Sequence, residues 1–470
     1  TGRGAGGGGL SRPTAAPGGG VGVGPLVELV AGPWGNGGIC ASRPAEGPVV
    51  FVSGAIPGER VQVRIVEERK RYRRGMVEHV LEPSAERVAP PWPAGAALGA
   101  TDMGHVRPAA ARTAKGDVAA ELLRHLGGVK RPFAVRAVGG EDSPAGTLGW
   151  RTKIELAVDS TGRAGMRRAR SHEVTPLESM PLAVDAIADL GLFQRHWAPG
   201  STVTAVAPSA SEALWLVDGR PAEAIRREIV TVAGEDFAYE LPAAAFWQLH
   251  RAAPALLAEL VLNAALGWAR GESRDAHLVG SVGRARGAAD GGRGHSAQLP
   301  GEAAGEADWA RGDSDGTVPW GKLDGARVWD LYAGAGLFTL PLAAAGAQVT
   351  AVEGERRAVG ALRANARDAG LRLGGAHAAD VAAALRRGLG GGRPDVVVLD
   401  PPRAGAGVGV VQAVAAAAPE RIVYVACEPA ALARDLGALL RDGYELTALD
   451  AFDLFPGTHH VELVAVADRS

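Results

Sequence analysis

The sequence predicts an α/β fold in which a small N-terminal β-barrel and a mixed central region precede a doubly wound parallel sheet. The sheet is predicted because apolar runs rich in β-branched residues recur after position 328 and alternate with Ala-, Leu- and Arg-rich segments of helical period. The barrel is predicted because short strand-like runs between 25 and 90 are separated by Gly and Pro turns. The expected divisions are a tail at 1–24, the barrel at 25–90, a central α+β domain at 91–242 and the sheet domain at 243–470.

Composition excludes several classes of protein. The chain has 470 residues, and 50 Lys and Arg stand against 52 Asp and Glu for a net charge of −2, so nucleic-acid binding would need local basic patches. Its 2 cysteines, Cys40 and Cys427, exclude a disulfide scaffold and any site built from four thiolates. No run approaches the roughly 18 apolar residues of a membrane span, and the tail lacks the apolar core of a secretory signal. The chain is therefore expected in the cytoplasm, with no membrane partner.

The N-terminal part begins with the Gly- and Ala-rich tail, which is expected to be disordered. Strands are predicted at 49–52, 61–66 and 76–81, with turn residues between the first two. Between the second and third strands lies a basic run with one tyrosine, 67–74. Charge alone favours a solvated hairpin tip there, and the alternative is a phosphate-contacting edge of an RNA-binding barrel.

The central part is predicted to hold a hairpin of strands 150–158 and 164–168 joined by the turn 159–162. A second basic cluster follows this turn and contains Arg163, Arg167, Arg168 and Arg170. The segment 271–318 is polar, Gly-rich and aperiodic, and it is too long for an ordinary connection within a compact domain. It is predicted to be a disordered insertion.

A glycine loop follows the first strand of the sheet domain, 328–331. Gly334 and Gly336 would let the backbone approach a bound nucleoside at the carboxyl edge of the sheet. Such a pair alone could be a packing turn, but the next strand ends at Glu353, where an acid commonly binds ribose hydroxyls. Thr339 stands where a dinucleotide site would carry a third glycine. The loop therefore favours S-adenosylmethionine, which has no pyrophosphate.

Two further motifs follow strands of the same sheet. The motif Asp400-Pro401-Pro402-Arg403 comes directly after the strand 396–399, where the prolines would fix the Asp400 carboxylate at the crevice. The alternative is a Pro-stiffened turn. Cys427 follows the strand 422–425 and precedes a helix whose N-terminus is expected to lower the thiol pKa. A buried cysteine is more often a small core residue, but this one is placed where strands deliver side chains to the crevice.

Two adjacent histidines, His459 and His460, precede the last predicted strand, 463–467. Adjacent residues of a strand point to opposite faces, so a shared metal ion is not expected and no metal site is predicted. Glu462 would instead lie opposite Cys427 and form with it a pair of thiolate and base.

These motifs together resemble the RNA uracil-5-methyltransferase family. The ordered series is DLYAGAGLFTLPLA, VEGE, DPPR, YVACEPAALARDL and DLFPGTHHVELVAV. The upstream FWQLH at 246–250 is similar to the family's FFQxN segment, and VFVSGAIPGERVQVRI with EPSAERVAPP resembles its N-terminal TRAM domain, an OB-like RNA-binding barrel. The resemblance covers about residues 25–470 apart from the insertion.

The resemblance implies a Rossmann-like methyltransferase domain that methylates C5 of a uridine in tRNA or rRNA. Cys427 would be the nucleophile that adds to uracil C6, and Glu462 the base that removes the C5 proton before Cys427 leaves. Asp380 would lie near the adenine of S-adenosylmethionine. The residues implied to line the cofactor site are Gln248, Tyr332, Glu353, Asp380 and Asp400, with Asp330 and Gly334 in the cofactor loop. RNA is the implied partner of a chain expected to be monomeric.

The chain departs from the family pattern at several positions. Ala333 replaces a frequent Cys, and Leu337 and Glu428 each replace an Asn. The four cysteines that hold an iron–sulfur cluster in many relatives align with Trp92, Leu98, Thr101 and Met180, so no cluster is predicted. The alternatives are an RNA-binding or RNA-folding protein with decayed catalysis, and a base N-methyltransferase on the same fold, which DPPR and Cys427 disfavour.

Overall fold

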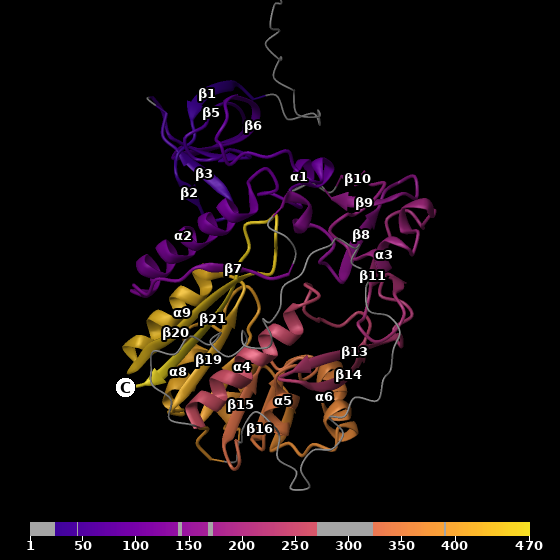
Figure 1. Ribbon diagram of the computed structural model, residues 1–470, viewed down its shortest axis with the longest axis vertical. Coiled ribbons are helices and arrows are strands. Elements are labelled where there is room, and N and C mark those ends of the chain that lie inside the picture. Colours follow the sequence, from indigo (N-terminus) through magenta and orange to yellow (C-terminus); the bar gives the residue numbers. More distant parts are fainter. Residues whose placement is uncertain (1–23, 45, 140–142, 168–172, 270–322, 390–391) are drawn as a thin grey trace, which may run out of the picture.

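The computed structural model of the chain, shown in Figure 1, describes residues 24–44, 46–139, 143–167, 173–269, 323–389 and 392–470. The predicted tail, apart from Gly24, and the predicted insertion at 271–318 lie outside these residues, as do Arg168 and Arg170 of the second basic cluster. Within the described ranges no helix has the length and apolar character needed to cross a membrane.

The N-terminal part is a six-stranded sheet in the order β1-β5-β6-β4-β3-β2. Burial alternates along β5, which places Val61, Val63 and Ile65 in a small core enclosed by the sheet. All three predicted strands are present in this barrel-like unit. The strands are β1 (Leu26–Val30), β2 (Trp34–Gly35), β3 (Ile39–Ser42), β4 (Val49–Ser53), β5 (Arg60–Glu68) and β6 (Tyr72–Glu82).

The basic run 67–74 forms the tip of the hairpin of β5 and β6, as charge alone predicted, and residues 68–71 are exposed. The two strands extend so far that only the turn 69–71 separates them. The register places Glu68 opposite Arg73, and the two side chains form an ion pair of 2.6 Å. Opposite charges across neighbouring strands stabilise the pairing, and this extends the hairpin.

The central part contains an antiparallel five-stranded sheet in the order β10-β9-β8-β11-β12. The predicted hairpin is confirmed as β8 and β9, and the Asp159 carboxylate closes its turn by accepting hydrogen bonds from the N–H groups of Thr161 and Arg163. The strands are β8 (Lys153–Val158), β9 (Ala164–Arg167), β10 (Val174–Pro176), β11 (Thr202–Val206) and β12 (Leu214–Val217), and two short helices, α1 (Pro93–Leu98) and α3 (Asp185–Ala188), flank them.

The C-terminal part is built on an eight-stranded sheet in the order β17-β16-β15-β18-β19-β21-β20-β7. The strands β15 to β19 are parallel as predicted, but β21 is antiparallel to both of its neighbours. The short loop between β20 and β21 permits only antiparallel pairing. The strands are β7 (Val135–Ala137), β15 (Arg327–Leu331), β16 (Gln348–Glu353), β17 (Gly375–Ala378), β18 (Val396–Leu399), β19 (Arg421–Ala426), β20 (Tyr444–Asp453) and β21 (Glu462–Arg469).

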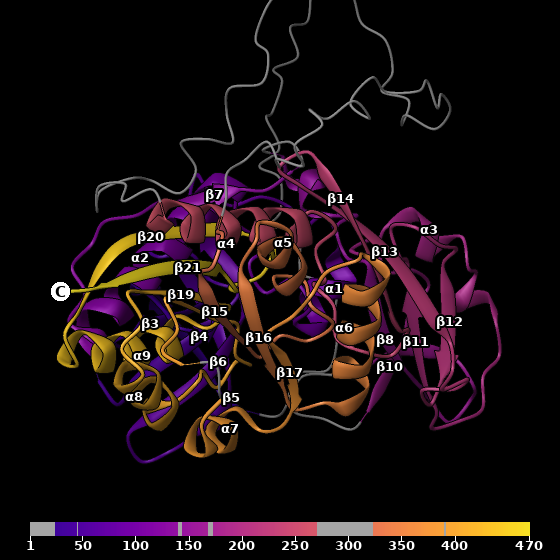
Figure 2. The same cartoon turned by 90° about the horizontal axis from the view of Figure 1, so that it is seen from below.

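Helices cover both faces of this sheet, as Figure 2 shows. One apolar core joins α4, α5, α6 and the hairpin of β13 and β14 to one face, and a second joins α2, α7, α8 and α9 to the other. This is the layered arrangement expected of an open α/β sheet. These elements are α2 (Pro108–Gly127), β13 (Ile225–Val232), β14 (Glu235–Pro242), α4 (Ala253–Ala269), α5 (Thr339–Ala344), α6 (Arg356–Asp368), α7 (Val381–Arg387), α8 (Val408–Ala416) and α9 (Pro429–Arg441).

The range 91–242, predicted as one central domain, divides between two parts of the fold. Its long helix α2 packs on α9, and β7 extends the large sheet by pairing with β20. Its last hairpin is also bound to the large sheet's layer, because the N–H of Glu240 donates to the Asn365 side chain and the Tyr239 hydroxyl donates to the Leu337 carbonyl. These contacts between residues far apart in the sequence are not visible in local composition.

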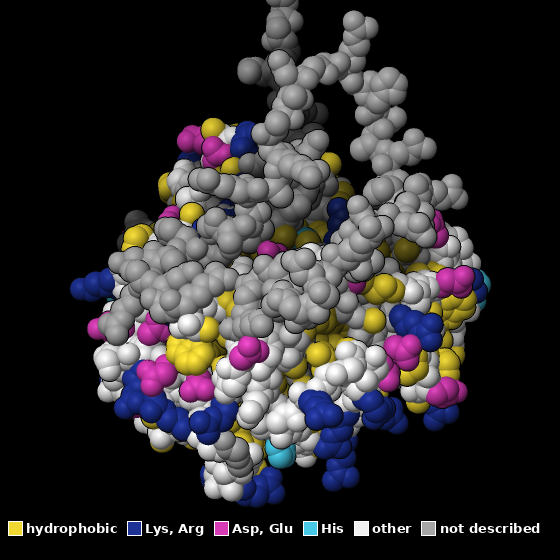
Figure 3. Space-filling model, turned by 60° about the horizontal axis from the view of Figure 1, so that its bottom comes forward, with side chains coloured by type: hydrophobic (Ala, Val, Ile, Leu, Met, Phe, Trp, Pro, Cys, Tyr) yellow, Lys and Arg dark blue, Asp and Glu magenta, His cyan; other side chains and the backbone are white. Residues whose placement is uncertain are grey.

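The surface is mixed in charge. In the space-filling view of Figure 3, Lys and Arg side chains follow the lower edge of the visible face, and Asp and Glu side chains lie among them. This pattern agrees with the near-neutral net charge of the chain.

Candidate active site

Cys427 lies at the carboxyl end of β19, between the end of that strand at Ala426 and the start of α9 at Pro429. In the register of β19 with β21, Ala426 pairs with Leu463. The next residues outward, Cys427 and Glu462, therefore come together at the end of the sheet. Cys427 is half-buried and forms no disulfide.

The Cys427 thiol is protonated in this environment. Its pKa is raised to about 12, first by burial and then by the charges of Glu462 and Asp400, while Arg403 acts in the opposite direction. The expectation that the helix N-terminus lowers this pKa is therefore wrong. Glu428, the residue after Cys427, caps α9 by accepting from the Ala430 N–H at 3.4 Å.

Two carboxyl groups beside Cys427 also hold protons more tightly than usual. Glu462 is only 4% exposed, and burial together with the charge of Asp400 raises its pKa well above the ordinary value. Burial raises the pKa of Asp400 to about 7, with a further contribution from Asp330. The amide of Gln248 lies 3.4 Å from Asp400 Oδ2 and connects the 246–250 segment to this group. Carboxyl groups in such an apolar crevice can accept and return protons near neutral pH.

The loop that carries Asp400 is held by a pair of residues that sequence reasoning missed. Asp435 Oδ2 accepts hydrogen bonds from the Tyr424 hydroxyl at 2.6 Å and from the N–H groups of Ala406 at 2.9 Å and Gly407 at 3.1 Å. Asp435 is 2% exposed, so each of these bonds is shielded from water. The sequence signal that could have identified Asp435 is its position among the apolar residues on the buried face of α9.

The predicted cofactor residues meet at the ends of β15, β16 and β18. Glu353 Oε2 accepts from the Gly334 N–H at 3.0 Å, so the acid at the end of β16 touches the glycine loop. Tyr332 has a positive φ of 68°, which turns the chain sharply out of β15. Asp380 is exposed and caps α7 by accepting from the Ala383 N–H at 2.9 Å. Glu353 and Gly334 thus touch, and Tyr332 and Asp380 follow the strands β15 and β17 at the edge of the sheet where the crevice is predicted.

The residues at this crevice fit S-adenosylmethionine. The buried oxygen Asp330 Oδ1 has no hydrogen-bond partner among the described residues, although the other oxygen accepts from the Thr339 hydroxyl. Burial raises the pKa of Asp330 to about 7. An amino-acid ammonium group would supply the missing donor, and the Glu353 carboxylate is placed to accept from ribose hydroxyls.

The two histidines lie in a turn and not in a strand, because β21 begins at Glu462. The rings of His459 and His460 lie side by side, with centroids 4.0 Å apart, so the premise that they point to opposite faces is wrong. The described residues contain no group of three metal-ligating side chains, and the His459 ring is bonded to Asp102.

The loop between β20 and β21 is fixed by two residues from the region before 120, which the sequence did not identify. Buried Lys115 lies 2.6 Å from Asp453 Oδ1 and also donates to the Phe455 carbonyl at 3.1 Å. The carboxylate of Asp102 accepts from the His459 N–H at 2.9 Å. This loop leads directly into Glu462, so α2 and the turn before it position the predicted base.

The chain is similar to known RNA methyltransferases. The chain is 35% identical over 454 residues to an uncharacterized RNA methyltransferase of Bifidobacterium longum, covering 90% of this chain and 92% of that protein. It is 33% identical over 444 residues to the 23S rRNA (uracil(1939)-C(5))-methyltransferase RlmD of Alkalilimnicola ehrlichii, covering 89% and 92%.

A family model and a solved structure agree with these relatives. Residues 392–469 match the model of the tRNA (uracil-5-)-methyltransferase family. The fold is similar to the crystal structure of Pyrococcus abyssi tRNA (uracil-54, C5)-methyltransferase in complex with S-adenosyl-L-homocysteine, with a TM-score of 0.61 and 17% identity over 94% of this chain and 100% of that one. The chain therefore belongs to the S-adenosylmethionine-dependent RNA (uracil-5-)methyltransferase family.

Proposed function

We propose that this protein methylates C5 of a uridine in RNA through a covalent bond between Cys427 and uracil C6. The observation that carries the proposal is the meeting of Cys427, Glu462 and Asp400 at the carboxyl ends of β18 and β19. A cysteine between two proton-holding carboxyl groups has the parts required for addition, proton removal and elimination.

The first step removes the thiol proton and forms the Cys427–C6 bond. The pKa of the thiol is about 12, so a nearby base must take its proton. Asp400, whose pKa is about 7, is ionised in part at neutral pH and is the base we assign to this step. The thiolate then adds to C6, and the electron pair of the C5–C6 bond moves toward the C4 carbonyl, which makes C5 nucleophilic.

The later steps use Glu462. When bound, S-adenosylmethionine supplies an electrophilic methyl group, for which Gln248, Tyr332, Glu353, Asp380 and Asp400 line the site, with Asp330 and Gly334 in its loop. After C5 has gained the methyl group it still carries its proton. Glu462, whose raised pKa means that it must first release its own proton to solvent, then removes the C5 proton as the carboxylate. The C5–C6 double bond forms again, the C6–S bond breaks, and the departing Cys427 thiolate takes back the proton held by Asp400.

Ribosomal RNA is the substrate class we propose. A relative that spans nearly the whole chain at 33% identity is a 23S rRNA methyltransferase, whereas the similarity to the tRNA enzyme rests on fold at 17% identity. The barrel at 25–90 and the central sheet would hold the RNA around the target, and the protein would act in the cytoplasm, where this RNA is found. The target base must leave its stack to reach Cys427.

We also propose that the protein works without an iron–sulfur cluster. Trp92, Leu98 and Met180 pack together in one apolar core, and Thr101 is 1% exposed. None of these side chains supplies a thiolate, so the residues present do not fit such a cluster.

The covalent step is tested with RNA containing 5-fluorouridine. Fluorine cannot leave C5 as a proton, so elimination should stall after methyl transfer and the protein should stay attached to the RNA. The expected result on a denaturing gel is a shifted band with S-adenosylmethionine, which is lost in Cys427→Ala and retained in Cys40→Ala, a control at a buried cysteine in the barrel. Absence of a shifted band in the unmodified protein would overturn the proposal. Parallel reactions with 23S rRNA and tRNA transcripts test the substrate class.

A further inference from the structure

Two hollows meet at the residue that follows Cys427. The smaller, of about 160 Å³ counting space open to solvent, is lined by Cys427 with Pro402 and Arg403. The larger, of about 410 Å³ counting space open to solvent, lies between the β2–β3 turn of the barrel, α2 and the loop between β20 and β21. Glu428 lines both. Because Glu428 follows Cys427 directly, the larger hollow, which we call the barrel groove, lies next to the reactive cysteine.

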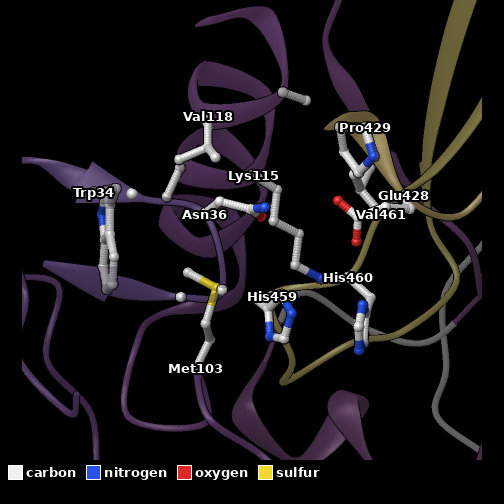
Figure 4. A pocket seen from close by; sticks show the side chains of 15 residues that line it. Trp34, Asn36, Met103, Lys115, Val118, Glu428, Pro429, His459, His460 and Val461 are labelled. Carbon is white, nitrogen blue, oxygen red and sulfur yellow. The ribbon is translucent and has the colours of Figure 1, made fainter. Parts of the chain in front are cut away.

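The barrel groove is lined by groups that bind bases. Trp34, at the start of β2, presents its indole ring to the groove from one side, and the imidazole rings of His459 and His460 lie across from it (Figure 4). Trp34 is half-buried, so one part of the ring packs on the barrel core and the rest is accessible. Aromatic rings in this setting stack on unpaired bases of single-stranded RNA.

The walls of the barrel groove are preformed. A Cβ atom built on Gly38 in the β2–β3 turn would lie 3.0 Å from His459 Cβ, so the barrel touches the loop before Glu462. The opposite wall is held by the bonds of His459 to Asp102 and of Lys115 to Asp453. A rigid site loses little conformational entropy when it binds its ligand.

Glu428 determines which part of a nucleotide can face it. Its carboxylate is turned toward the groove in Figure 4. The Oε1 atom of this carboxylate accepts a long hydrogen bond of 3.4 Å from the Ala430 N–H. A carboxylate repels phosphate and accepts hydrogen bonds without donating any. Guanine is the base whose Watson–Crick edge offers two adjacent donors, N1–H and the amino group, whereas the other bases present an acceptor beside each donor.

We propose that the barrel groove binds the nucleotide next to the target uridine, with its base stacked on Trp34 or the histidine rings and guanine preferred through Glu428. This inference rests on the proposed function, because it takes the target base to lie at Cys427, the residue before Glu428. It assigns a specificity role to Glu428, one of the two residues that replace an Asn of the family pattern.

The test uses short single-stranded RNAs that contain one uridine and carry each of the four bases on either side of it. We expect Trp34→Ala to raise the Kd and the KM for RNA about tenfold with little change in kcat. We expect Glu428→Gln to lower the preference for guanine at one neighbouring position about tenfold while the affinity for the other bases changes little. Trp268→Phe on α4 and Glu212→Gln, both outside the groove, are the matched controls and should behave as the unmodified protein.

Two outcomes would overturn the inference. One is an unchanged Kd in Trp34→Ala, and the other is a Glu428→Gln protein that keeps the guanine preference or loses affinity equally for all bases. Trp34→Phe and a thermal melt of each variant separate lost stacking from lost folding. The covalent reaction is scored separately with 5-fluorouridine RNA at saturating concentration. Its failure in the unmodified protein would refute the proposed function, whereas an intact reaction with unchanged Kd and base preference would refute only the groove.

Discussion

Among single residues, Glu462 offers the sharpest test of the proposed mechanism. We predict that Glu462→Gln still adds to uracil and accepts the methyl group but releases product slowly, because the amide cannot remove the C5 proton. A glutamine is isosteric with the protonated Glu462 that the buried site favours, so the fold should persist. The measurement is a denaturing gel with ordinary uridine-containing RNA, on which an adduct should accumulate. Normal turnover by this variant would place the base elsewhere, with Asp400 or His459 as the next candidates.

Asp400 should link stability to pH. The pKa of Asp400 is raised from 3.8 to about 7 in the folded state, so the folded chain binds more protons than the unfolded chain between those values, and stability falls as pH rises through this window. Removal of the charge in Asp400→Asn should therefore stabilise the protein at pH 7 and have no effect near pH 4. About three pKa units correspond to about 4 kcal/mol, and partial contact with solvent reduces the expected gain to roughly 2 kcal/mol.

Urea unfolding at both pH values measures this difference. The exposed Asp117→Asn on α2 is the matched control and should leave the midpoint unchanged at either pH. A variant that is less stable at pH 7, or equally stabilised at both values, would contradict the assignment. The same substitution should slow methyl transfer, because it removes the group assigned to accept the thiol proton.

Among the elements, the contact of α2 with α9 tests how the fold positions Cys427. A Cβ atom on Gly127 would lie 2.5 Å from the Ala433 carbonyl oxygen, and the two helices can approach only because no side chain intervenes. We predict that Gly127→Ala destabilises the protein by about 1–3 kcal/mol and lowers kcat, because α9 begins two residues after Cys427.

A substitution of the same kind in the same helix should have the opposite sign. A Cβ on Gly116 would meet Val135 at 3.6 Å, an ordinary contact, so Gly116→Ala should stabilise by about 0.5–1 kcal/mol through helix propensity. Thermal unfolding of both variants measures the contrast. Equal effects would show that the close approach of α2 and α9 does not limit stability.

For the molecule as a whole, the apolar core of the central part contains three of the four residues that the resemblance aligns with cluster cysteines: Trp92, Leu98 and Met180. Trp92 is 5% exposed and lies in one apolar core with Leu98 and Met180. A Cβ on Gly95 would lie 2.0 Å from the Trp92 ring, so the ring rests directly on the α1 backbone. We predict that purified protein is colourless, contains no stoichiometric iron and keeps its activity with chelators present.

Metal analysis and a visible absorption spectrum decide this point, and stoichiometric iron would refute it. Trp92→Ala should in addition cost roughly 3–5 kcal/mol of stability in urea unfolding, as expected for a large buried side chain. Trp268→Ala, at a half-buried position of α4, should cost less. Equal costs would show that Trp92 does not hold this core together.

The order of the elements and the place of the reactive groups follow from the sequence by itself. Apolar runs separated by helical segments predicted β15, β16, β18 and β19, and the motifs after them predicted that Cys427, Glu462 and Asp400 lie together. The sequence could place these groups because a parallel sheet brings the carboxyl ends of its strands to one edge. A residue that directly follows such a strand therefore lies at that edge.

Only the tertiary structure decided the chemistry around those groups. The pKa of Cys427 is raised and not lowered, because it depends on burial and on carboxylates that come from other strands. The loop before Glu462 is held by Lys115 through Asp453, a contact between residues 338 positions apart. Local sequence encodes strands, helices and turns through short-range sterics and periodicity, whereas desolvation and charge pairing depend on which distant segments pack together.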